Sequence, residues 1–227
     1  MQLDGYTLLL QGEFKEKFDA YRALILEYNE RYNLTTILDE KDMFYKHFLD
    51  SVVGEKYFKN GAKVIEIGSG AGFPSMPLKI IRDDLKFTLV ESVGKKCEFL
   101  HAVVDKLGLK GVNIYSKRAE DLAKDANFRE SYDVATARAV ARMNTLTEYC
   151  LPFVRKGGVF VAYKSGDETE IEEAHSAYKI LGGKLKSVER YELPEGYGER
   201  TLAVVEKIQT TPNKYPRGQG KERKNPL

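Results

Sequence analysis

Tryptophan is absent from this 227-residue chain, and cysteine is almost absent. The two cysteines, Cys97 and Cys150, stand in neither a Cys-x-x-Cys pair nor a Cys/His spacing suited to a metal ion. Each lies in an apolar, helix-like pattern, which predicts a buried thiol rather than a redox or nucleophilic group. We therefore expect no metal site.

Long apolar runs and a strong charge imbalance are also missing. No uninterrupted apolar run approaches the roughly 20 residues that cross a bilayer. The N-terminus has no basic region before its apolar piece and no small-residue cleavage site. These features predict a cytoplasmic protein without a membrane partner. The formal net charge is only +2, so any nucleic-acid contact has to come from local clusters of cations.

The two ends of the chain differ from its middle. Residues 1–60 predict a helical extension packed on the core: apolar residues recur at steps of three or four from about residue 11, and a second helix follows a turn, with Asp39 as its N-cap. Residues 209–227 are polar, basic and rich in proline and glycine, which predicts a mobile or surface-draped tail.

Between these ends, residues 61–208 alternate strand-like and helix-like runs. The strand-like runs are KVIEI, KFTLVE, VNIYS, YDVATA, GVFVAY, KLKSVERYELP and ERTLAVVEKI. Such alternation predicts an α/β fold, with a mostly parallel sheet covered on both faces. Only a short loop, EGYG, separates the last two runs, so they predict a hairpin that adds an antiparallel edge strand.

A glycine-rich turn follows the first strand-like run. Gly68, Gly70 and Gly72 form G-x-G-x-G, whereas a dinucleotide-binding turn has G-x-G-x-x-G, which would place its third glycine at Phe73. In a parallel sheet, ligands bind at the carboxyl ends of the strands. The glycine spacing therefore indicates a nucleotide-like ligand other than a dinucleotide.

Two carboxylates strengthen this interpretation. Glu66 lies two residues before Gly68, and Glu91 ends the second strand 23 residues after it. That offset is near the roughly 20 residues expected for an acid that binds a ribose diol. Ala119 and Glu120 follow the third strand, where they could meet an adenine edge. The alternative interpretation is that these acids bind no ligand, Glu66 being a solvated acid and Glu120 an acid at the start of a helix.

The segment EIGSGAGFPSMPL resembles the cofactor loop of class I S-adenosylmethionine-dependent methyltransferases. The stretches RYNLTTI, KHFLDSVV, ESVGKKCEFL, YDVATARAVA, GGVFVAYK and KYPRGQGKERKNPL resemble one family more closely, the RsmG or GidB 16S rRNA guanine-N7 methyltransferases. The resemblance implies a Rossmann-like class I methyltransferase fold with a seven-stranded sheet. It also implies S-adenosyl-L-methionine as cofactor and, as substrate, a guanine of the decoding-centre loop of 16S rRNA.

The resemblance also implies roles for individual residues. Gly68 and Phe73 would contact the cofactor in the first loop, Glu91, Ser92 and Val93 its ribose, and Ala119 with Glu120 its adenine. Arg138 would lie at the methyl-transfer cleft, in contact with cofactor or substrate. This sequence departs from the family where Ser75 replaces a usual glycine and where Glu66 and Glu91 replace aspartates.

The chemistry of guanine N7 explains why no nucleophile and base pair is evident. N7 carries a lone pair and no proton, so its methylation needs proximity and alignment rather than a general base. The three histidines, His47, His101 and His175, all sit in helix-like segments and are expected to be structural or exposed. Of these, His47 is the open case, because it falls in a stretch that matches the family.

RNA binding is expected to be electrostatic and shape-directed. The partner would be 16S rRNA, within the small ribosomal subunit, and nothing requires more than a monomer. Candidate contacts near the cleft are Lys95, Lys96, Arg138, Arg142 and Lys164, and those in the tail are Lys214, Arg217, Lys221, Arg223 and Lys224. Alternatives are a NAD(P)-dependent oxidoreductase, a small-molecule methyltransferase and a non-catalytic RNA-binding factor.

Overall fold

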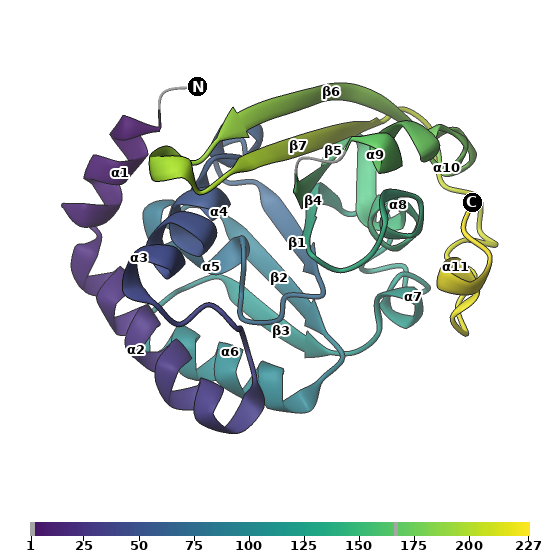
Figure 1. Cartoon of the computed structure of the whole chain (residues 1–227). Coiled ribbons are helices and arrows are strands. Elements are labelled where there is room, and N and C mark those ends of the chain that lie inside the picture. Colours follow the sequence, from purple (N-terminus) through teal and green to yellow (C-terminus); the bar gives the residue numbers. More distant parts are fainter. Residues whose placement is uncertain (1–2, 166–167) are drawn as a thin grey trace.

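The computed structural model describes residues 3–165 and 168–227. Its centre is one seven-stranded sheet in the order β3-β2-β1-β4-β5-β7-β6 (Figure 1). The strands are β1 (Lys63–Ile67), β2 (Lys86–Glu91), β3 (Val112–Ser116), β4 (Tyr132–Arg138), β5 (Val154–Ser165), β6 (Gly183–Glu192) and β7 (Glu199–Lys207). The first five pair in parallel, and β7 runs antiparallel between β5 and β6. The predicted fold class and closing hairpin are confirmed.

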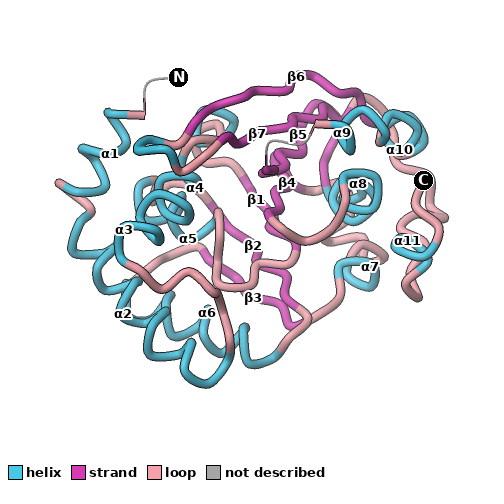
Figure 2. Tube along the Cα trace, viewed as in Figure 1, coloured by secondary structure: helices cyan, strands magenta, loops and turns pink. Residues whose placement is uncertain are grey.

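Helices cover both faces of the sheet (Figure 2). They are α1 (Asp4–Gln11), α2 (Lys15–Tyr32), α3 (Glu40–Met43), α4 (Asp50–Val52), α5 (Ser75–Ile81), α6 (Gly94–Leu107), α7 (Ala119–Leu122), α8 (Met143–Cys150), α9 (Thr169–Glu173), α10 (His175–Ile180) and α11 (Lys221–Lys224). Successive residues of β1 pack into two different cores. Val64 lies in the core beneath α2, α5 and α6, and Ile65 lies in the core beneath α7, α8 and α10. Cys97 and Cys150 are buried free thiols, as predicted.

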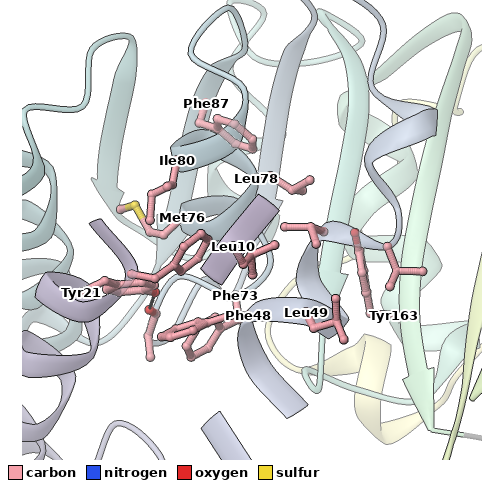
Figure 3. Close-up of a cluster of buried hydrophobic side chains, with 14 of the residues drawn as sticks. Leu10, Tyr21, Phe48, Leu49, Phe73, Met76, Leu78, Ile80, Phe87 and Tyr163 are labelled. Atoms are coloured by element: carbon pink, nitrogen blue, oxygen red, sulfur yellow. Dashed lines mark hydrogen bonds between the residues drawn. The ribbon is translucent and has the colours of Figure 1, made fainter. Parts of the chain in front are cut away.

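The N-terminal helices share the first of these cores with the sheet. Figure 3 shows Leu10, Tyr21 and Phe48 packed with Phe73 and Met76, which come from the glycine-rich loop and α5. The Tyr21 hydroxyl donates to the carbonyl oxygen of Ala71 inside that loop. Residues 3–58 therefore support the loop from one side and bury it.

The helical boundaries in this region differ from the prediction. The helix expected from about residue 11 is α2, which begins at Lys15, and a shorter helix, α1, ends at Gln11 just before it. Asp39 caps the second segment as predicted, with its Oδ1 accepting from the amide of Asp42 at 2.9 Å. A π-helical turn, Phe44–Leu49, follows α3. Such turns occur often at functional sites, and the sequence pattern did not reveal this one.

The C-terminal segment, residues 209–227, is not a loose tail. The side chains of Thr211, Tyr215 and Glu222 are buried, and α11 packs against α8. The segment expected to be mobile or surface-draped is anchored to α8 in the structure, and its anchors were not predicted. Composition misled here, because the anchoring groups belong to distant parts of the chain.

Gly72 is predicted to be a glycine of the loop whose replacement lowers the free energy of unfolding. A Cβ at this position would lie 2.5 Å from Met76 Cγ and 3.0 Å from the Tyr21 hydroxyl, whereas a Cβ at Gly61 would meet no described atom within 4 Å. Both have positive φ, of 89° and 68°. Gly61→Ala should cost about 1–2 kcal/mol of unfolding free energy from backbone strain. Gly72→Ala should cost about 1–3 kcal/mol more, from overpacking. Equal losses in urea titrations would contradict this assignment.

Candidate functional site

The glycine-rich loop is fixed to the end of β2. The amides of Gly68 and Ser69 both donate to the carbonyl oxygen of Val90, at 2.8 and 3.2 Å. A Cβ at Gly68 would lie 2.7 Å from Val140 Cγ2, whereas one at Gly70 would meet nothing closer than a carbonyl oxygen at 3.9 Å. Gly68 and Gly72 are therefore demanded by packing within the protein. Gly70 is the glycine whose open side faces a cavity.

Glu91 joins this loop to the next one. Its Oε2 accepts from the Gly70 amide and its Oε1 from the Val93 amide, both at 2.9 Å. The side chain is largely buried but lines a cavity together with Gly70. Since each carboxylate oxygen can accept a second hydrogen bond, Glu91 can still bind a diol. The geometry suits the ribose-binding role that the sequence predicts for it.

Three cavities follow one another along the carboxyl ends of the strands, and we call them together the edge cleft. The first is lined by Ile67, Gly68, Val90, Ser92, Lys117, Arg118, Ala119, Glu120, Val140, Tyr149 and Arg223. The second is lined by residues 34–37, His47, residues 68–71, Phe73, Glu91, Lys96, Arg138 and Ala139. The third is lined by Ile37, Lys46, His47, Asp50, Arg138, Ala139, residues 163–165, Glu170 and Arg200. Gly68 is common to the first two, and His47 and Arg138 to the last two.

The edge cleft brings together most of the predicted cofactor residues. Gly68, Ser92, Ala119 and Glu120 line the first cavity, and Gly70, Phe73, Glu91 and Arg138 line the second. Val93 lies beside them and donates its amide to Glu91. These positions fit an adenine in the first cavity and a ribose between the two. Phe73 also supports the wall, since its ring stacks on the imidazole of His47 with centroids 4.3 Å apart.

Glu66 lies elsewhere, beneath the glycine-rich loop and away from the lining of the three cavities. Its side chain is fully buried. Its Oε2 accepts from the amide of Ser75 at 3.3 Å, and its Oε1 has no hydrogen-bond partner among the described residues. Burial raises the pKa of Glu66 to about 8, so the carboxyl group holds its proton at neutral pH. In this structure Glu66 supports the start of α5.

Arg138, at the end of β4, is held by the π-helical turn and α4. Its Nη1 donates to Asp50 Oδ2 at 2.9 Å and to the carbonyl oxygen of Lys46 at 3.1 Å. Its Nη2 lies 3.0 Å from His47 Nδ1, and its guanidinium carbon lies 4.8 Å from the centroid of the Phe73 ring. Arg138 is therefore a fixed cationic wall between the second and third cavities.

His47 is neutral in this arrangement. Burial, and then the charge of Arg138, lower the pKa of His47 to about 3. His47 Nδ1 lies 3.0 Å from the Arg138 guanidinium, which can only donate, and 3.2 Å from the carbonyl oxygen of Lys46, which can only accept. From the closer, charged partner we assign the imidazole proton to Nε2, which donates to Thr35 Oγ1 at 2.9 Å. Both ring nitrogens are thus in use, and His47 is a structural link rather than an exposed group.

Asp50 is the site residue that sequence reasoning missed. It accepts from Arg138 and, through Oδ1, from the Tyr191 hydroxyl at 2.6 Å. The signal was a carboxylate among apolar neighbours in FLDSVV, three positions after His47. That spacing places both side chains on one helical face. The other two histidines, His101 and His175, lie on exposed helix faces, as expected.

The predicted RNA contacts fall into two groups. Lys95 and Lys96 lie in the first turn of α6, and the side chain of Arg142 is 67% exposed despite its ion pair with Glu173. Lys164 is 9% exposed and pairs with Glu170 inside the third cavity. The tail residues Arg217 and Arg223 are engaged within the protein. Arg217 pairs with the buried Glu148, and Arg223 lines the first cavity.

Within residues 3–165 and 168–227, no group of three or more His, Cys, Asp or Glu side chains could hold a metal ion. In the same ranges, no helix has the length and apolar character needed to span a membrane.

The buried Glu66 predicts a specific dependence of stability on pH. An unfolded Glu has a pKa of roughly 4.3, so between about pH 4.5 and pH 8 the folded state keeps a proton that the unfolded state has released. The free energy of unfolding therefore loses a contribution as pH rises through this window. Glu66→Gln should remove that loss, so that the variant gains stability over the parent from pH 4 to pH 8. A difference in urea midpoints that is independent of pH would contradict a neutral Glu66.

Comparisons with known proteins identify the family of this chain. The family model described as GidB, rRNA small subunit methyltransferase G, matches residues 14–200. A protein of Lactobacillus acidophilus named ribosomal RNA small subunit methyltransferase G is 45% identical, over 100% of this chain and 97% of its own length. One with the same name from Staphylococcus aureus is 46% identical, over 100% and 95%.

Solved structures support the fold. TYW2 of M. jannaschii, in complex with AdoMet, is 15% identical with a TM-score of 0.56, covering 76% of this chain and 80% of its own. A SAM-dependent O-methyltransferase from Thermotoga maritima is 16% identical with a TM-score of 0.54, covering 83% and 71%. These two likenesses concern the fold alone. The match over most of the chain and the full-length relatives confirm the sequence resemblance, and this chain belongs to the rRNA small subunit methyltransferase G (GidB) family.

Proposed function

We propose that this protein transfers a methyl group from S-adenosyl-L-methionine to N7 of a guanine in the decoding-centre loop of 16S rRNA. The observation that carries the cofactor part is the bond from the Gly70 amide to Glu91, at the open side of the loop. It holds a carboxylate in the second cavity, which shares Gly68 with the first cavity and is also lined by Arg138. Membership of the GidB family supports rRNA as the substrate.

The cofactor would be held by groups that follow three strands, β1, β2 and β3. Ser92, Ala119 and Glu120 line the cavity for the adenine, and Glu91 accepts from the ribose hydroxyls. The open side of Gly70 allows the rest of the cofactor to approach the backbone of the loop. When bound, S-adenosylmethionine supplies an electrophilic methyl group on a sulfonium. The residues of the cleft position that group and exclude water.

The acceptor would enter the third cavity, beyond Arg138. Guanine N7 has a lone pair, so it needs alignment rather than deprotonation. The site agrees with this requirement, because His47 uses both ring nitrogens within the protein and offers no free base. Methyl transfer places a positive charge on the guanine. Since Asp50 pairs with Arg138 at 2.9 Å, that charge does not face an uncompensated cation.

The RNA would be bound by cations at the rim of the edge cleft. Lys95, Lys96 and Arg142 flank it, and each neutralised phosphate adds to affinity in a salt-dependent way. Lys164 would act inside the third cavity, where it can meet the base or its phosphate. We place the substrate in the small ribosomal subunit in the cytoplasm, and propose that one copy of the chain suffices.

The direct test is transfer of tritium from labelled S-adenosylmethionine into small-subunit particles that lack the modification. Mass mapping of nuclease fragments then locates the methyl group. We expect label at a single guanine of the decoding-centre loop, as 7-methylguanine. Label confined to low-molecular-weight products would refute the rRNA assignment. Micromolar binding of NADH without binding of S-adenosylhomocysteine would refute a methyltransferase altogether.

Gly70→Val should abolish cofactor binding while the protein stays folded. The branched side chain would occupy the cavity beside Glu91, which no protein atom fills now. Gly61→Val is the matched control, because it puts the same side chain at a positive φ in open space far from the cleft. Calorimetric titration with S-adenosylhomocysteine should show a loss of at least tenfold, about 1.4 kcal/mol, for Gly70→Val alone. Equal affinity in the two variants would mean that the loop is only a turn.

Asp50→Asn should slow methyl transfer with little effect on cofactor affinity. The amide keeps the shape of the side chain but leaves the Arg138 charge uncompensated beside the base. Asp133→Asn is the control, since Asp133 pairs with Arg155 at 2.7 Å at the opposite end of β4. Single-turnover rates on small subunits should fall about tenfold, the effect of about 1.4 kcal/mol in the barrier, for Asp50→Asn only. Equal rates in both variants would remove Asp50 from the site.

A further inference from the structure

The first cavity has a wall that comes from the C-terminal segment. Arg223, in α11, lines this cavity together with Ser92, Ala119 and Glu120. Its Nη2 donates to the carbonyl oxygen of Val140 at 3.3 Å, across the mouth of the same cavity. The basic composition of residues 209–227 predicts RNA contacts for Arg223. Its position instead places it where the cofactor is expected.

The segment is held in this position by a buried ion pair. The Arg217 guanidinium donates to both oxygens of Glu148, with Nε to Oε1 at 3.0 Å and Nη2 to Oε2 at 2.7 Å. The Arg217 amide also donates to Oε1, at 2.9 Å. The Glu148 side chain is fully buried. Removing one partner of such a pair leaves a buried uncompensated charge, so the segment is fixed rather than incidentally placed.

A second anchor lies at Glu222, the residue before Arg223. Thr145 Oγ1 donates to the carbonyl oxygen of Glu222 at 2.8 Å, and the buried Glu222 carboxylate accepts from the amide of Gly218. Both anchors attach to α8, and Figure 1 shows α11 lying beside α8 and α7. The backbone around Arg223 is therefore tied to the helix that carries Tyr149, another residue of the first cavity.

From this arrangement we infer that Arg223 is a cofactor-binding residue and that residues 209–227 close the adenine end of the site. This inference rests on the proposed function for the identity of the ligand. The guanidinium is planar, always charged and a donor only, so it can stack on a purine face or donate to a ring nitrogen. We therefore assign the basic C-terminal segment to the cofactor site rather than to the RNA interface.

Calorimetric titration of the full chain tests the inference. The ligands are S-adenosylhomocysteine and 5′-methylthioadenosine, which keeps the nucleoside but lacks the amino-acid portion. Arg223→Ala should weaken both by at least tenfold and by the same factor, because the contact is made to the part they share. Lys224→Ala is the matched control: it removes a cation from the neighbouring exposed position, which does not line the cavity. It should change neither affinity by more than twofold.

The possible outcomes separate the inference from the function on which it rests. If the parent protein binds S-adenosylhomocysteine and Arg223→Ala binds it equally well, the inference is wrong and the proposed function stands. If Arg223→Ala instead weakens only small-subunit binding, with a flatter salt dependence, the residue belongs to the RNA interface and the inference is again wrong. If the parent protein binds neither nucleoside, the proposed function itself fails.

Limited proteolysis gives a second measurement that does not depend on a substitution. Trypsin can cleave after Arg223 and Lys224, which lie on exposed positions of α11. Saturating S-adenosylhomocysteine should slow cleavage at these two bonds at least fivefold, while cleavage after the exposed Lys59, remote from the cleft, keeps its rate. An equal rate at α11 with and without ligand would overturn the placement of the segment at the cofactor.

Discussion

The bond between Arg138 and the Asp50 carboxylate is the interaction on which the rest of the site depends. It joins the end of β4 to a segment 88 residues earlier in the chain, and the neighbouring His47 adds a second contact at 3.0 Å. Arg138 also donates to the carbonyl oxygen of Lys46, so one guanidinium ties both the π-helical turn and α4 to the carboxyl edge of the sheet. A buried pair of this kind is costly to break from one side, about 3–5 kcal/mol. The helical N-terminal residues are therefore part of the site.

This constraint also sets the electrostatics of the edge cleft. Arg138 is held by Asp50, the Lys46 carbonyl and the Phe73 ring, so it cannot swing to follow a ligand. Its charge is balanced locally, and His47 is neutral because burial and the guanidinium disfavour its protonation. A preorganised wall in which the Arg138 charge is paired and His47 is neutral suits a reaction that moves a methyl group between two neighbours without proton transfer. Catalysis at such a wall depends on alignment of the methyl group with its acceptor and needs no general base.

The sequence predicted the sheet well and the long-range pairs poorly. β1, β2 and β3 match the strand-like runs residue for residue, because apolar runs between turn residues are local signals. The glycine spacing and Glu91 predicted a ligand at the carboxyl edge of the sheet, where cavities lie. The partnership of Arg138 with Asp50 and that of Arg217 with Glu148 were not predicted, since each joins residues 69 or more positions apart. The anchoring of residues 209–227 was missed for the same reason. Their composition is typical of a solvated segment, whereas the groups that anchor them lie in α8.

A crystal structure of the complex with S-adenosylhomocysteine tests the central claim most directly, namely that one continuous cleft binds the cofactor and leads to Arg138. The account predicts adenine in the first cavity beside Ala119 and Arg223, ribose hydroxyls on Glu91, and the sulfur atom facing the third cavity. It further predicts that the bond between Arg138 and Asp50 stays in place when the ligand binds. A ligand bound outside the edge cleft, or an Arg138 released from Asp50 to contact the ligand, would contradict it.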